Sequence, residues 1–258
     1  MEIDKTTLND LSIFDHENEY SIFTNLDFTR TIGGREMLRH FFGRSLNSVE
    51  AITGVQETIK VILEKKAQWP EIITNGTLMV IQKFYEASID QIPLHPSTTS
   101  AYAYKLFHTP DFSMVKYSTS HCFDFVKGMM QLTEIFLVDD SPAPLKKLLE
   151  KARSIINKEQ FEIIAKKEKY DTLLMTEMLS LGGFFRYHYK HNFYELMEIY
   201  YHLDAWYSMA TASKNFNLVF PEFINSNEPT VQASGLYHIL LPEPVTYDIT
   251  LNKENNFI

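Results

Sequence analysis

The chain has 258 residues, of which 45% are hydrophobic and 14% aromatic, and its formal net charge is −9. A chain of this length buries a sizeable core, either as one large domain or as two small ones. The acidic balance argues against these residues being the main contact with DNA, because non-specific duplex binding depends on lysine and arginine neutralising phosphates.

The first strong helix signal lies in residues 26–46. Thr29 and Thr31 precede the glycine pair Gly33 and Gly34, and apolar residues then recur at helical spacing. Thr29 or Thr31 can accept hydrogen bonds from the free N–H groups at the helix start, while the glycines allow a tight turn or a close backbone approach. The stretch predicts a capped amphipathic helix and contains no catalytic group.

Helical periodicity continues to about residue 214. It predicts helices over 48–66, 69–88, 101–108, 110–138, 145–156, 160–165, 170–189 and 192–214. Two proline-containing stretches, 89–99 and 139–144, are predicted to be connections.

The pattern becomes β-like after Pro221. Strands are expected over 236–241, 245–251 and 256–258. The predicted fold class is therefore mainly α, a multi-helix domain with a short β-containing C-terminal segment.

The single cysteine and the N-terminus bear on the cellular compartment. Cys122 excludes a disulfide framework, favours a reducing environment and lies in a predicted helix, where we expect it to pack in the core. Residues 1–10 are mixed and polar, unlike a signal peptide, and no uncharged run approaches the roughly 18 residues of a membrane span. We expect a cytoplasmic protein with no membrane partner.

Three stretches of the sequence resemble the core domain of the MutS family of DNA mismatch-repair proteins. They are Leu-Asp-x-Thr-x-Thr at 26–31 with the helix that follows, Leu-Asp-x-x-x-Ser-x-Ala at 203–210, and the strand-forming residues 234–258. The resemblance implies a helical core and lever domain over 1–220 and the start of a truncated ATPase domain over 221–258. The resemblance begins at the N-terminus and leaves no room for the mismatch-reading and connector domains, so we expect a shortened member of that family if Met1 is the natural start.

The same resemblance implies a function. These helices would relay movement between an ATPase domain and DNA or a partner, and the longer protein would bind ATP and magnesium and form a homodimer through its ATPase domain. Pro244, Val245 and Tyr247 would flank the adenine, although packing on a sheet is the alternative interpretation of all three. The sequence contains no Gly-x-x-x-x-Gly-Lys-Ser/Thr loop to hold the phosphates, so we expect no cofactor and no ATP hydrolysis in this chain itself.

Two other patterns imitate functional sites. Phe84 and Phe193 each begin a Phe-x-Glu element, which mismatch-recognising relatives use to read DNA, but both lie within apolar helical periodicity. An intercalating side chain must be exposed, so we expect both rings in the core. His188, His191 and His202 lack the carboxylate or cysteine partners of a zinc pattern, and no metal site is predicted from them.

An alternative to the relay remains open. The chain could be a stand-alone helical protein-interaction module with no nucleotide or DNA role. A separate helical enzyme would need paired titratable groups in a pocket, and the sequence holds no motif of that kind.

Overall fold

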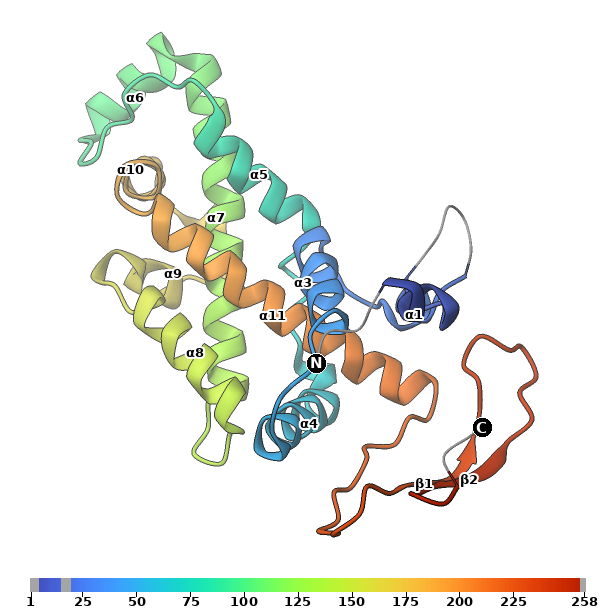
Figure 1. Cartoon of the computed structure of the whole chain (residues 1–258). Helices are drawn as coiled ribbons and strands as arrows, with labels where there is room; N and C mark the ends of the chain where they lie inside the picture. The colour runs from blue at the N-terminus through green and yellow to red at the C-terminus, as the bar shows by residue number, and fades with distance from the viewer. Residues whose placement is uncertain (1–4, 15–19, 256–258) are drawn as a thin grey trace.

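A computed structural model of the chain describes residues 5–14 and 20–255 (Figure 1). Most of this part is helical and a small antiparallel pair of strands follows, which confirms the predicted fold class. The helices and strands are α1 (Lys5–Asp10), α2 (Ile22–Leu26), α3 (Ile32–Phe42), α4 (Val49–Glu64), α5 (Asn75–Glu86), α6 (Thr98–Phe107), α7 (Thr109–Phe136), α8 (Ala143–Ile156), α9 (Glu162–Lys166), α10 (Met175–His188), α11 (Lys190–Asn215), β1 (Val231–Leu236) and β2 (Tyr247–Leu251). No helix in the described ranges combines the length and apolarity needed to cross a lipid bilayer.

Helix α11 runs through the middle of the helical body and packs on α3, α4 and α8 (Figure 1). Its buried residues face two separate cores. Leu196 and Tyr200 belong to the larger core, whereas Ala205 belongs to a smaller one with Phe23 of α2 and Leu38 of α3. A helix with apolar residues on more than one face is an internal helix. Helix α11 therefore contributes to both cores and joins the helices that pack around each of them.

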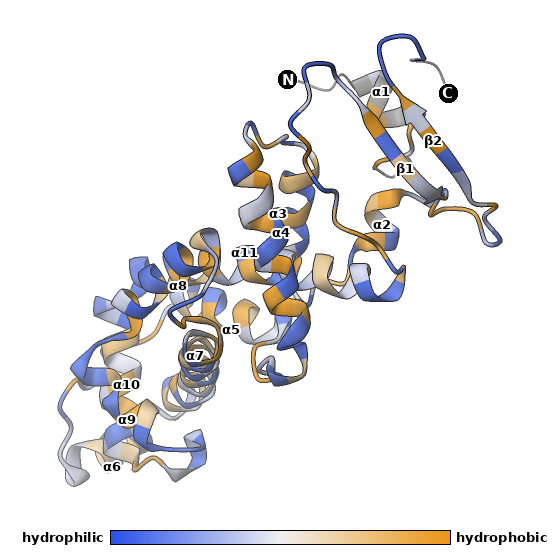
Figure 2. Cartoon of the chain, turned by 90° about the horizontal axis from the view of Figure 1, so that it is seen from below, coloured by the Kyte–Doolittle hydropathy of each residue, from blue (hydrophilic) through white to orange (hydrophobic). Residues whose placement is uncertain are grey.

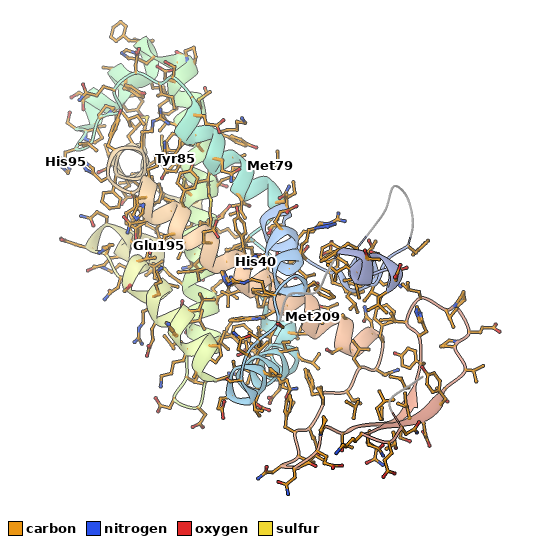
Figure 3. All side chains as sticks on the ribbon, in the orientation of Figure 1. His40, Met79, Tyr85, His95, Glu195 and Met209 are labelled. Atoms are coloured by element: carbon orange, nitrogen blue, oxygen red, sulfur yellow. The ribbon has the colours of Figure 1, made fainter. Side chains whose placement is uncertain are left out.

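The larger core contains many aromatic rings. Phe125 of α7 stacks on Phe193 of α11, and Phe185 of α10 meets Phe193 edge-on, with ring centroids 5.9 and 5.1 Å apart. Tyr85, labelled in Figure 3, donates its hydroxyl hydrogen to the carbonyl of Phe185. Phe84 and Phe193 are 1% and 0% exposed, which confirms that both are core residues. Neither ring is placed to wedge between DNA bases.

The helix starts are set by capping side chains. Ser48 and Thr74 each accept a hydrogen bond from the backbone N–H three residues later, at the starts of α4 and α5. The prediction of a cap at Ser48 is confirmed. The helix predicted from residue 69 begins only at Asn75, because Pro70 holds Trp69 in an extended conformation and Thr74 then supplies the cap.

The two strands form a hairpin that stands apart from the helical body (Figure 2). They pair antiparallel, with Val231 opposite Leu251 and Leu236 opposite Tyr247. The register is irregular between these pairs, where Gly235 has a φ of +65°. This left-handed conformation is one that glycine adopts without strain.

One of the predicted strands is wrong. A strand was expected over 236–241, but β1 ends at Leu236 because the bulge at Gly235 bends the chain there. Residues 238–241 form a turn instead, in which the Leu241 N–H donates to the His238 carbonyl. The strand predicted over 245–251 is found as β2, while the one predicted over 256–258 lies outside the described residues.

Candidate functional site

A buried carboxylate joins α11 to the start of α3. The side chain of Asp204 is 0% exposed. It accepts hydrogen bonds from the backbone N–H groups of Arg30 and Thr31 at 2.9 and 3.0 Å, and from the Thr31 hydroxyl at 2.7 Å. One side chain therefore fixes the turn before α3 onto a helix far away in the sequence.

Thr31 connects this carboxylate to the end of α3. It is the N-cap residue: its Oγ1 accepts from the Gly34 N–H at 3.0 Å while its hydroxyl donates to Asp204. A negative charge near a helix N-terminus is favourable, because unpaired N–H groups point towards it. The predicted cap is confirmed and is Thr31. Thr29 instead donates to the Asp27 carboxylate at 2.6 Å.

Two glycines allow α3 to approach α11 closely. A Cβ atom added at Gly34 would lie 2.0 Å from Oδ2 of Asp204, and one added at Gly33 would lie 2.3 Å from the ring of Tyr201. Both separations are far below van der Waals contact. A side chain at either position would push the helices apart, so the predicted close approach is confirmed.

Ser208 makes a second attachment one helical turn after Asp204. Its Oγ accepts from the Phe28 N–H at 2.7 Å and donates to the Leu26 carbonyl at 2.8 Å. Residues four apart lie on the same face of a helix, so Asp204 and Ser208 together hold the segment 26–31 along α11. We call this arrangement, made by Asp204, Ser208 and residues 26–34, the α3–α11 junction.

The electrostatics of the junction follow from its burial. Burial raises the pKa of Asp204 to about 6, although hydrogen bonds from Arg30 and Thr31 and the positive charge of Arg30 oppose the rise. The Arg30 guanidinium itself binds both carboxylate oxygens of Glu71, at 3.0 and 2.5 Å, which raises the pKa of Arg30 and lowers that of Glu71. The buried charge is thus stabilised mainly by backbone and hydroxyl donors.

A third segment is attached to the same place. The Ile32 N–H donates to Oδ1 of Asn75, the first residue of α5, at 3.0 Å. With the Arg30–Glu71 pair, this contact ties the loop before α5 to the start of α3. The junction therefore links α11, α3 and α5 through directional hydrogen bonds.

The chemistry of the junction suits mechanical coupling. The carboxylate oxygens accept from fixed donors, and Gly34 packs directly against the Asp204 carboxylate. Separating the start of α3 from α11 would be costly, since it would leave Asp204 and several N–H groups buried without partners. Asp204 belongs to one of the stretches that resemble the MutS family, but its contact with Thr31 was not predicted from the sequence. The available signal was an aspartate within a strongly apolar helix.

The residues predicted to flank an adenine lie elsewhere, on the hairpin. Val245 precedes β2 and is 84% exposed, and Tyr247 begins β2 and is 48% exposed. Pro244 also precedes β2, and the two strands lie away from α3 (Figure 1). Pro244 is partly buried, whereas Val245 and Tyr247 are exposed, and the adenine contact of these three residues stays a prediction.

The other candidate groups are separate from the junction. His202 contacts the Glu198 carbonyl through Nδ1 at 2.9 Å. Within the described ranges, neither His202 nor His188 or His191 belongs to a set of converging metal-ligating side chains. Cys122 is 0% exposed and burial raises the pKa of its thiol, so the prediction of a packing role is confirmed.

Comparison with known proteins adds no assignment. No model of a known protein family matches the chain, and no curated protein sequence matches it. Function must therefore be argued from the arrangement of the residues.

Proposed function

We propose that the chain is the core and lever part of a MutS-like DNA-processing protein, in which α11 relays movement between the C-terminal hairpin and the far end of the helical body. The observation that carries this proposal is the α3–α11 junction. Two of the stretches that resemble the MutS family, 26–31 and 203–210, are hydrogen-bonded to each other there. Their contact supports treating them as parts of one structural unit.

The geometry of α11 supports a relay. It is a continuous helix of 26 residues, about 39 Å long at 1.5 Å per residue. One end follows α10 at the far side of the body, and the other leads to the hairpin (Figure 1). Movement delivered to the hairpin end would shift α11 together with α3. Such a relay requires two global states that make different contacts.

The exposure of the hairpin supports its role as an attachment point. Most residues of β1 and β2 are exposed, on both faces of the pair, and none is fully buried. An isolated two-stranded hairpin is only marginally stable in water, and free strand edges are templates for further pairing. We infer that the hairpin is the beginning of an ATPase sheet. ATP, magnesium and a homodimer contact would then belong to the longer protein.

DNA binding by the longer protein tests the relay. The assay is fluorescence anisotropy on duplex DNA at about 50 and about 200 mM salt, with and without ATP and magnesium. We expect nucleotide to change the affinity of the longer protein, and the 258-residue chain alone to bind weakly because its net charge is −9. Asp204→Asn in the longer protein should reduce the nucleotide effect while ATP hydrolysis continues. An affinity that does not respond to nucleotide would refute the relay.

A stand-alone helical interaction module is the second candidate, and one observation favours it. Tyr102, Leu106 and Phe107 of α6 are 61, 72 and 77% exposed. Large apolar side chains exposed together mark surfaces that contact other molecules. The reading frame after codon 258 separates the two candidates. A sequence close to Gly-Pro-Asn-Met-x-Gly-Lys-Ser there supports the relay, whereas a stop codon supports the module.

A further inference from the structure

Three potential metal ligands converge where α5, α6 and α7 meet. Asp90 follows α5, His108 lies between α6 and α7, and Asp111 is in the first turn of α7. Nδ1 of His108 lies 3.0 Å from Oδ2 of Asp90, and the Asp90 N–H donates to Oδ2 of Asp111 at 3.1 Å. One ligand atom from each residue lies within 4.8 Å of the others. The group is accessible, since the His108 and Asp90 side chains are 40 and 70% exposed.

A buried hydroxyl beside this group gives independent support. Tyr104 is 5% exposed, and its hydroxyl has no hydrogen-bond partner among the described residues. Its ring stacks on His108, with centroids 5.1 Å apart and planes 21° from parallel. The Tyr104 ring therefore lies directly against one of the three converging side chains.

Unpaired buried hydroxyls are uncommon, because each one forfeits a hydrogen bond that it makes with water in the unfolded chain. A cation held by the two carboxylates would carry water ligands. Those waters, or a carboxylate reoriented by the cation, would accept the hydrogen of Tyr104. A hydrogen bond from Tyr104 to a metal-bound water or carboxylate is the contact expected of a residue that orients the groups binding a metal directly.

We propose that Asp90, His108 and Asp111 bind a divalent cation of the Zn²⁺ type, with Tyr104 as an outer-shell hydrogen-bond donor. One imidazole and two carboxylates are ligands that Zn²⁺ accepts, and three protein ligands leave a fourth position for water. In a tetrahedral site with bonds of about 2.1 Å, ligand atoms lie about 3.4 Å apart. The ligand atoms lie within 4.8 Å of one another, so they would have to move roughly 1 Å closer to surround the ion.

The cation would fix the far end of the helical body. Asp90 is held by the chain leaving α5, and the other two ligands lie on either side of the α6–α7 boundary. Bridging them would set the direction of α6, the helix that carries the exposed Tyr102, Leu106 and Phe107. This site is independent of the proposed relay, because none of its ligands belongs to the α3–α11 junction.

Titration calorimetry with ZnCl₂ on the metal-free 258-residue chain tests the site. We expect one equivalent of Zn²⁺ to bind, and His108→Ala or Asp111→Asn to weaken binding by more than the 10–100-fold loss typical of outer-shell changes. The matched control is His95→Ala, which removes an exposed histidine from the α5–α6 connection outside the cluster (Figure 3). It should change the affinity less than twofold. Circular dichroism confirms that each variant is folded.

Tyr104→Phe gives a second, opposite readout. It should weaken Zn²⁺ binding by about tenfold. It should also raise the unfolding temperature of the metal-free chain, because a buried unpaired hydroxyl is removed while the ring remains. The proposal is overturned if the wild-type chain binds no Zn²⁺, if His108→Ala binds as tightly as the wild type, or if His95→Ala loses as much affinity as His108→Ala.

Discussion

The pH dependence of folding tests whether Asp204 is a buried charge in solution. The pKa of this carboxyl is about 6 in the folded chain and 3.8 when it is free in water. Between these values the folded chain binds a proton that the unfolded chain does not, so the free energy of unfolding falls as the pH rises. The contribution is fully present below about pH 3.8 and is lost as the pH rises through about 6. Between pH 5 and pH 7.5 the loss is about 1 kcal/mol.

Asp204→Asn isolates this effect, because asparagine keeps the shape of the side chain and does not ionise. At any single pH the variant mixes two opposing changes, the loss of an acceptor for Arg30 or Thr31 and the removal of a buried charge. The change in its effect with pH reports the charge alone. Urea unfolding followed by circular dichroism at pH 5.0 and 7.5 should show the wild type gaining about 1 kcal/mol on the variant at the lower pH.

A matched control uses an exposed carboxylate. Hydrogen bonds from Ser234 and Gly235 lower the pKa of Asp248, so this group is ionised in both the folded and the unfolded chain above pH 5. Asp248→Asn should therefore have the same effect at pH 5.0 and 7.5. If the profiles of the wild type and Asp204→Asn run parallel, Asp204 is solvated and the description of the junction is wrong.

Three further predictions concern packing. Gly34→Ala should lower the free energy of unfolding by about 2–3 kcal/mol, because the added Cβ would overlap a buried carboxylate oxygen. The control is Gly76→Ala in α5, where the nearest atom to an added Cβ is 3.5 Å away, and it should stabilise the chain by up to about 1 kcal/mol. Similar urea midpoints for the two variants would count against the close contact at Gly34. Ser208→Ala leaves the Phe28 N–H without its acceptor and should cost about 1–3 kcal/mol in the same assay, and a loss below about 0.5 kcal/mol would show that water replaces the serine. Cys122 should react with a thiol reagent only as fast as the chain unfolds, because the thiol is buried and its pKa is raised; rapid labelling of the native chain would contradict this.

The sequence predicted those elements whose signals are local. Periodicity located α4, α7 and α11 to within a few residues, and a serine or threonine before an apolar run located the caps of α3 and α4. These features depend on residues close together in the chain. The strand predicted over 236–241 was wrong because an apolar run does not reveal the backbone conformation of Gly235, which ends β1 and turns the chain.

The sequence could not predict which distant residues meet. Apolar periodicity shows that Asp204 lies on a buried helix, but its partners, Arg30 and Thr31, depend on how α3 crosses that helix. The cluster of Asp90 and His108 was missed for the same reason, since its members come from the ends of separate helices and form no spaced motif. The adenine contact of Pro244, Val245 and Tyr247 stays a prediction, because an exposed hairpin does not define the geometry of a ligand.

The central claim is that residues 26–34 and α11 move as one rigid unit, and native-state hydrogen exchange tests it most directly. The N–H groups of Phe28, Arg30 and Thr31 all donate to side chains of α11. If the junction is rigid, the opening free energy of these three amides equals that of the amides in the middle of α11. In Asp204→Asn all three amides should lose protection together. Exchange of the three amides at much lower opening free energy than α11 in the wild-type chain would show that the segment detaches on its own, and a relay through the junction would be refuted.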